Sequence, residues 1–125
     1  MRYSLLLNNA EPEEGQISGE DLATFRTAFD VYAKSLDAAG VLVSADILQP
    51  VAASTTVTLR NGSLQVQDGP FADSKEQLAG SFVIDVPDLD AALAWAEKCP
   101  GAQYGVIEIR PSAIVFRDGQ WQNTI

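Results

Sequence analysis

Histidine is absent from this 125-residue chain, so any proton-transfer chemistry must come from other side chains. Without histidine the Ser-His-Asp and Cys-His arrangements are excluded, and a carboxylate becomes the natural candidate for a general base. We select Asp46 and Glu108 as candidate bases and Tyr104 as a candidate proton donor. A carboxylate in this role needs a partly apolar cavity that raises its pKa.

A second group of candidate residues could bind a ligand. Most of them lie in the stretch "DGPFADSKEQLAG", positions 68–80, which combines a turn, an aromatic side chain and several charges. We expect Asp68, Phe71, Lys75 and Glu76 to lie around a cavity that takes a small molecule. Arg110 would hold an anionic or oxygen-rich group of that ligand.

The same stretch also has a purely structural interpretation. Gly69 and Pro70 favour a turn, and Phe71 would anchor the loop to the core. Asp73 and Glu76 have the spacing of a capping box, which predicts about one turn of helix before the chain enters a strand at Gly80. Both interpretations stay open at this point.

Composition excludes several classes of function. With no histidine and the single Cys99, a zinc site and an internal disulfide are excluded. Only a carboxylate site for Mg²⁺ or Ca²⁺ stays open, and since no phosphate-binding or calcium-binding motif is present we expect neither metal nor cofactor. The net charge of −9, from 17 acidic and 8 basic residues, disfavours nucleic acid and anionic membrane as partners. The sequence shows no signal peptide and no apolar run long enough to span a membrane, which predicts a cytoplasmic protein.

Hydrophobic periodicity predicts the elements that position these residues. Alternating patterns predict strands at 2–8, 41–48, 80–86 and 104–111 and a hairpin at 54–67 with an Asn61-Gly62 turn. Apolar residues at spacings of three and four predict two helices, one between Ser18 and Gly40 and one between Asp88 and Cys99. The segment 113–122 is expected to form a short edge strand or a tail.

This order of elements indicates the fold class. Two β-α-β halves around a hairpin predict an α+β, ferredoxin-like sandwich with both helices on one face of an antiparallel sheet. With 46% hydrophobic residues the chain can bury a core as one domain, 1–125, of which 112–125 would be a C-terminal extension.

The face of the sheet away from the helices mixes apolar and charged residues. Alternation along the strands assigns to it two sets of side chains. The apolar set is Leu6, Leu42, Val83, Tyr104 and Val106, and the charged set is Asp46, Asp85, Glu108 and Arg110. Such a mixture predicts a homodimer whose two sheets face each other across a partly polar cavity. The alternative is that Glu108 and Arg110 form surface pairs with neighbours across the sheet.

The run "DGPFADSKEQLAG" closely resembles the D-G-P-F-x-[ED]-[ST]-K-E-Q-L-x-G signature of the YCII-related, or DGPF-domain, family, and the resemblance extends from position 1 to about position 111. It implies a ferredoxin-like fold and a homodimer, the dimeric α+β barrel. Some members are encoded beside or fused to extracytoplasmic-function sigma factors, which implies regulation. Other members resemble enzymes with a His-Asp pair, which this chain lacks. Ser44-Ala45-Asp46 also departs from the Gly and Glu that often follow "VLV" in the family.

Two functions are therefore expected. The first is a non-enzymatic homodimer that binds a small ligand or a regulatory partner, with a sigma-factor link implied by the resemblance. The alternative is a cofactor-free lyase, isomerase or oxygenase acting on a small cyclic or aromatic compound, by analogy of fold alone.

Overall fold

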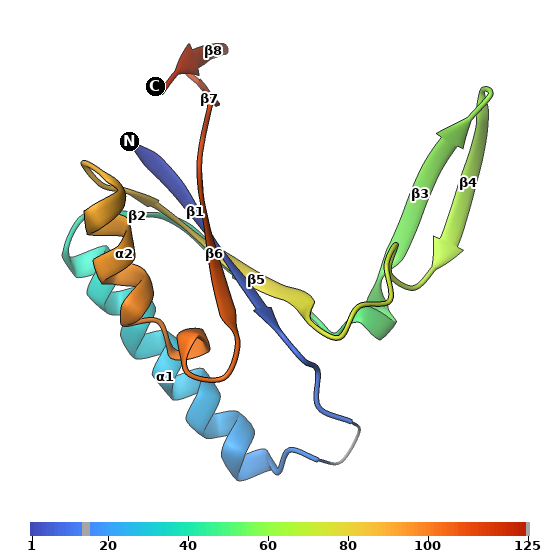
Figure 1. Cartoon of the computed structure of the whole chain (residues 1–125), viewed down its shortest axis with the longest axis horizontal. Coiled ribbons are helices and arrows are strands. Elements are labelled where there is room, and N and C mark those ends of the chain that lie inside the picture. Colours follow the sequence, from blue (N-terminus) through green and yellow to red (C-terminus); the bar gives the residue numbers. More distant parts are fainter. Residues whose placement is uncertain (14–15, 125) are drawn as a thin grey trace.

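The computed structural model describes residues 1–13 and 16–124, and within them the chain is an α+β protein (Figure 1). It has two α-helices, α1 (Gly19–Ala38) and α2 (Leu89–Glu97), and two short 3-10 helices, η1 (Val51–Ala53) and η2 (Pro100–Ala102). The strands are β1 (Arg2–Asn9), β2 (Leu42–Ile47), β3 (Thr55–Arg60), β4 (Ser63–Asp68), β5 (Gln77–Asp85), β6 (Val106–Pro111), β7 (Ile114–Arg117) and β8 (Gln120–Asn123).

Four strands form the main sheet, in the order β2-β5-β1-β6, and every neighbouring pair is antiparallel. The two crossover connections carry α1 and α2, and both helices lie on the same side of this sheet (Figure 1). The arrangement is consistent with the ferredoxin-like fold that the element order predicts. We call the side of the sheet away from the helices the bare face.

Each α-helix begins at a side-chain cap that the sequence indicates. The Ser18 hydroxyl accepts a hydrogen bond from the Asp21 backbone N–H, and the Asp88 carboxylate accepts one from the Ala91 N–H. These oxygens satisfy backbone donors that the first helical turn leaves without partners. Gly40 follows the end of α1 with a positive φ angle, a conformation that favours glycine.

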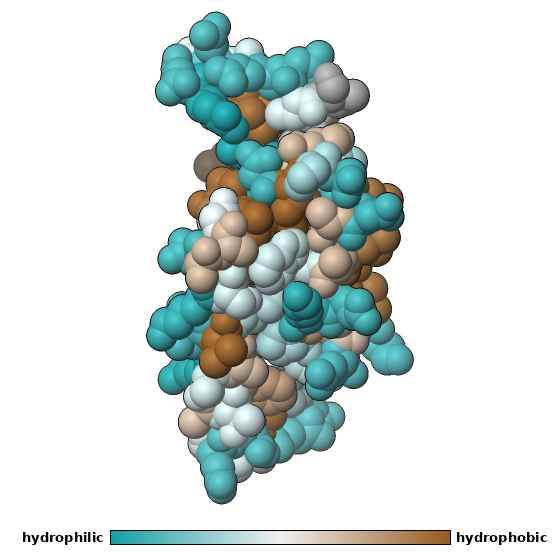
Figure 2. Space-filling view, turned by 90° about the vertical axis from the view of Figure 1, so that its left-hand side faces the viewer, coloured by the Kyte–Doolittle hydropathy of each residue, from teal (hydrophilic) through white to brown (hydrophobic). Residues whose placement is uncertain are grey.

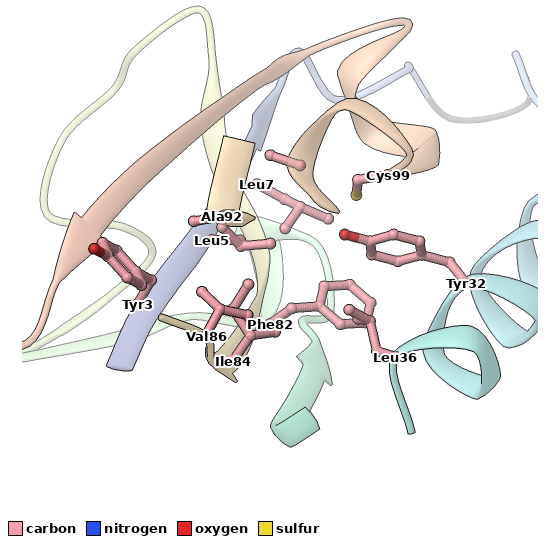
Figure 3. Close-up of a cluster of buried hydrophobic side chains, with 11 residues drawn as sticks. Tyr3, Leu5, Leu7, Tyr32, Leu36, Phe82, Ile84, Val86, Ala92 and Cys99 are labelled. Carbon is pink, nitrogen blue, oxygen red and sulfur yellow. The ribbon is translucent and has the colours of Figure 1, made fainter. Parts of the chain in front are cut away.

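The core lies between the two helices and one face of the sheet (Figure 3). Tyr3, Leu5 and Leu7 of β1 and Phe82 and Ile84 of β5 are buried there. The Tyr32 ring meets the Phe82 ring edge to face with centroids 5.1 Å apart, and the Tyr32 hydroxyl donates a 2.7 Å hydrogen bond to the Trp95 carbonyl. This bond joins α1 to α2 above the sheet. Some apolar residues of both helices are not covered, since Leu22 of α1 and Leu89 and Leu93 of α2 are exposed.

Strand β2 departs from the alternation that the sequence indicates. Its pairing with β5 shifts between Leu42 and Ser44, so Leu42 lies opposite Ile84 and packs against the core. Placing Leu42 on the bare face was therefore wrong, and Val43, the next residue of the strand, is exposed. A single irregular residue moves the side chains on one side of it to the opposite face. Beyond the shift, Ser44 and Asp46 lie on the bare face as predicted.

The β3–β4 hairpin, 55–68, extends away from the main sheet on the side opposite to the helices (Figure 1), and we call it the arm. Within the described part of the chain its two strands pair only with each other. Asn61 and Gly62 both have positive φ angles, which confirms the predicted turn of type I′. At the base of the arm the Gly69 N–H donates to the Ser54 carbonyl at 2.8 Å.

The C-terminal segment is more regular than expected. Strands β7 and β8 form a second hairpin, in which the centroids of the Phe116 and Trp121 rings lie 5.3 Å apart. Val115 on its opposite face is buried, whereas Phe116 and Trp121 are exposed.

Hydrophilic residues cover much of the outer surface on the helical side, and the hydrophobic residues there form scattered patches (Figure 2). Neither α-helix among the described residues combines the length and the apolar character that a membrane crossing requires.

Candidate functional site

The bare face carries side chains from all four strands of the main sheet. Cross-strand pairing places the even-numbered residues of β1 beside their partners on β5 and β6. The β5 residues of this set in turn lie beside their own partners on β2. The thirteen positions are Arg2, Ser4, Leu6, Asn8, Ser44, Asp46, Leu78, Ser81, Val83, Asp85, Val106, Glu108 and Arg110. Leu6 and Val83 are half-buried and Val106 is exposed, so an apolar centre is flanked by charges.

The two candidate bases lie at opposite edges of this face. One row across the sheet runs from Asp46 through Ser81 and Leu6 to Glu108. Three inter-strand steps separate Asp46 from Glu108, which corresponds to about 14 Å. Both carboxylates are exposed. Within one protomer they cannot act together on one small molecule.

Arg110 lies one row further along the sheet, opposite Ser4. Its Nε is 3.8 Å from the Glu108 carboxylate, and both side chains are more than half exposed. The ion pair runs along β6 to the next residue on the same face, rather than across the sheet as the surface-pair alternative expected. Arg110 therefore presents a guanidinium to the solvent with an acceptor beside it.

The segment between the arm and β5 does not form the predicted capping box. The stretch 69–76 is irregular, and the chain enters β5 at Gln77, where a helical turn was expected. The Ser74 hydroxyl donates to the Glu76 carbonyl at 2.6 Å, and the Gln77 side-chain amide donates to the Ser74 carbonyl at 2.8 Å. These bonds hold an extended turn in place of a helix, because Gln77, Leu78 and Gly80 already pair with β1.

Phe71 does not anchor this segment to the core, because its side chain is 88% exposed. Asp68, Lys75 and Glu76 are exposed as well. The strand that follows Lys75 and Glu76 begins opposite Asn9, whereas Arg110 lies opposite Ser4. Those two rows are separated along β1 by roughly 17 Å. One protomer alone therefore spreads the predicted ligand-binding residues along the sheet and its end.

Tyr104 is not a bare-face residue. It lies in the turn after η2, before β6 begins at Val106, and its ring packs edge to face on Phe25 of α1 with centroids 5.3 Å apart. Burial raises the pKa of the Tyr104 phenol, and negative charge at Cys99 would raise it further. The assignment of Tyr104 to the same face as Glu108 was wrong, because the last strand starts later in the chain than the sequence pattern indicated.

Two shallow hollows in the described part of the chain lie elsewhere. One of about 330 Å³ lies beside the start of α1 and is lined by Ile17, Asp21, Thr24 and Phe25. The other, of about 260 Å³, lies between α2 and β6 and includes Leu93 and Ile107. Neither is lined by a predicted site residue. The described segments, 1–13 and 16–124, also contain no group of three or more carboxylate, cysteine or histidine side chains placed to hold a metal ion.

Exposed apolar residues on the arm were not selected from the sequence. Val57 lies opposite Val66 and Leu59 opposite Leu64, so all four share one face of the hairpin. Each is between 60% and 67% exposed. The signal was present in the sequence as alternating apolar residues on both sides of Asn61-Gly62, but alternation also describes a hairpin that is packed on its own domain.

Comparison with known proteins supports the family resemblance that the loop signature indicated. The sequence profile of the YCII-related domain matches residues 1–113. An uncharacterized protein of Rhizobium meliloti (strain 1021) is 36% identical over 123 residues, which cover 96% of this chain and 98% of that protein. This chain therefore belongs to the YCII-related domain family.

Proposed function

We propose that this chain is one half of a two-fold dimer that binds a small ligand or a regulatory partner in a cavity between the two subunits. The observation that carries the proposal is the bare face, where no other described part of the chain forms a layer over Leu6, Val83 and Val106 while the helices cover the opposite face. Exposed apolar patches that are bordered by polar residues usually mark interfaces or ligand-binding surfaces.

Burial of the bare face supplies the driving force for this assembly. Each Å² of apolar surface removed from water contributes about 25 cal/mol. Packing the same face of two copies against each other removes surface from both at once, because a two-fold interface uses one patch twice. The charged residues at the two edges, Asp46 and Glu108 with Arg110, would then line the enclosed space.

A second subunit also provides the wall that a ligand site needs. Most of the predicted site residues of one protomer are exposed, and none of them lines either of the two hollows described above. Small-molecule sites are concave and bury most of the ligand surface. Two opposed faces would form such a space, with Arg110 as donor and Asp46 and Glu108 as acceptors for a polar group of the ligand.

The regulatory form of the proposal follows from the family resemblance, in which some members are linked to extracytoplasmic-function sigma factors. In that case the occupant would be a protein segment in place of a metabolite. The catalytic alternative requires Asp46 or Glu108 to act as a base, and the dimer cavity would then have to raise the pKa of that carboxylate by burying it. Reproducible conversion of a ligand by the pure protein would select the alternative.

The decisive experiment is a measurement of mass in solution at micromolar concentration, by sedimentation equilibrium. We expect twice the 13.4 kDa of one chain. Val106→Asp should dissociate the dimer, whereas Val31→Asp should not, because Val31 is also exposed but lies on α1 on the helical side. A monomeric wild-type protein would overturn the proposal.

The ligand is sought with a panel of small cyclic and aromatic carboxylic acids, scored by the rise in melting temperature. Binding in the cavity should disappear in Val106→Asp and weaken in Arg110→Gln. Binding that persists in a monomeric Val106→Asp variant would place the ligand site within one protomer and contradict the inter-subunit cavity.

A further inference from the structure

We propose that the arm, 55–68, is a dimerisation arm whose apolar face packs on the second copy of this chain. The inference rests on the proposed dimer and extends it, because it names the element of one subunit that contacts the other. The sequence pattern describes that element only as a hairpin.

The first argument is the stability of the arm itself. It pairs with no other strand of the described chain, and Val57, Leu59, Leu64 and Val66 point their shared face into solvent. A two-stranded hairpin without packing partners is marginally stable at best in water. The regular pairing from Thr55 opposite Asp68 to Arg60 opposite Ser63 therefore calls for a surface that covers the apolar face.

The second argument is the size of the interface. The bare face offers thirteen side-chain positions, whereas a stable interface of standard size uses about twice as many on each side. Face-to-face packing of the sheets alone would therefore be small. Each arm would contribute further residues to the same assembly, including two cross-strand apolar pairs, and would bring the interface into the usual range.

The third argument is the direction in which the arm extends. It leaves the main sheet on the bare-face side and not on the helical side (Figure 1). A second copy docked on the bare face would therefore lie on the same side as the arm. Two-fold symmetry would give each subunit one arm that reaches the other.

Charge favours a second copy over other occupants. The chain carries a net charge of −9, but the arm has only Arg60 and Asp68 as charged residues. The bare face is also close to neutral, with two arginines, Arg2 and Arg110, against three carboxylates. Two acidic copies can approach through these surfaces with little like-charge repulsion. An anionic partner such as nucleic acid would find no excess of positive charge there.

The arm would also complete the ligand site. Asp68 ends the arm, and Phe71 and Lys75 follow it in the chain. Lys75 lies far from Arg110 within one protomer, because the strand it precedes begins at the other end of the sheet. These residues lie at the base of the arm. An arm that packs on the partner would hold the partner's bare face close to its own base, so the cavity would be built from both chains.

The test compares two neighbouring residues that point to opposite faces of β4. Leu64→Lys places a charge on the apolar face, and Gln65→Lys places the same charge on the other face. Sedimentation equilibrium should show at least a tenfold rise in the dimer dissociation constant for Leu64→Lys and no change for Gln65→Lys. Leu59→Lys, at the cross-strand partner of Leu64, should repeat the effect, and circular dichroism should show that all three variants remain folded.

Hydrogen exchange gives an independent readout. Amides within the arm should be protected in the wild-type dimer and exchange rapidly in Leu64→Lys. If Val106→Asp dissociates the dimer but Leu59→Lys and Leu64→Lys both leave it intact, the arm proposal fails while the dimer stands. If the wild-type chain is a monomer at micromolar concentration, both proposals fail.

Discussion

Asp46 and Glu108 belong to the same row of the main sheet but lie at its two opposite edges, with Ser81 and Leu6 between them. The separation of about 14 Å follows from three inter-strand spacings. Within one protomer the two carboxylates therefore lie at the two edges of the bare face and are too far apart to form a catalytic pair.

The two carboxylates should be dispensable for folding. Both are exposed, and the Glu108–Arg110 pair at 3.8 Å belongs to the class of surface ion pairs worth about 0–1 kcal/mol. We expect Asp46→Asn and Glu108→Gln each to change the free energy of unfolding in urea by no more than about 0.5 kcal/mol. Any loss of ligand binding in these variants then reports on the site. If an activity is found and both variants retain it, neither carboxylate is the base.

Gly80→Ala should destabilise the protein. A Cβ at this position would lie 2.5 Å from the Asp46 carbonyl oxygen and 3.1 Å from the Ile47 Cδ1 atom, so β2 and β5 would have to separate. We expect a loss of about 1–3 kcal/mol in urea unfolding. Gly19→Ala is the control, since a Cβ there meets nothing within 4 Å and alanine favours the helix. An unchanged stability for Gly80→Ala would contradict a close approach at the last residue of the DGPF signature.

Tyr32→Phe should remove the bond between the two helices and little else. The Tyr32 hydroxyl donates to the Trp95 carbonyl at 2.7 Å in a partly buried setting. Its loss should cost about 1 kcal/mol of unfolding free energy. Tyr3→Phe is the matched control, because Tyr3 is equally buried but its hydroxyl meets only the weakly accepting Met1 sulfur at 3.4 Å. Equal losses in the two variants would mean that the Tyr32 bond contributes nothing specific.

Stability should fall at alkaline pH. Burial raises the pKa of the Cys99 thiol and of the Tyr32 and Tyr104 phenols. A group whose pKa is higher in the folded state holds its proton more tightly there. Its contribution to the free energy of unfolding is therefore fully present below its pKa in the unfolded state. The contribution is lost as pH rises through the folded pKa. The unfolded values are about 8.5 for cysteine and about 10 for tyrosine, so the decline should begin above about pH 8.5.

Urea unfolding from neutral to strongly alkaline pH measures this decline, and Cys99→Ala should flatten its first part. The native thiol should also resist alkylation at mildly alkaline pH, because it is buried and the thiolate is the reactive form. Rapid alkylation of the folded protein under those conditions would contradict the burial of Cys99.

Local patterns were sufficient for the elements that form the core. The two helix starts depend on short-range hydrogen bonds, and the structure confirms the caps at Ser18 and Asp88. The turn of the arm depends on local φ angles, and the structure confirms it at Asn61-Gly62. The alternation of Leu5 and Leu7 with Ser4 and Leu6 likewise predicts which face of β1 is buried. The loop signature indicated the family, which the match over residues 1–113 confirms.

The candidate site depended on features that no short window contains. The shift in β2 that turns Leu42 to the core arises where its pairing with β5 changes, and Tyr104 packs on Phe25 because a helix and a distant turn meet in space. Phe71 is an apolar residue of the kind that anchors a loop to the core, yet its side chain is exposed because the chain passes beyond the sheet there.

The sequence by itself determined the two α-helices, the approximate positions of the main-sheet strands and of the arm, the buried face of β1 and the family, because these follow from contacts between residues near in the chain or from a long motif. Only the tertiary structure decided that Asp46 and Glu108 lie at opposite edges and that the arm stands apart with its apolar face uncovered. The physical reason is that strand order and register are set by pairing between distant segments. A shift of one residue in that pairing moves a side chain from the core to the surface.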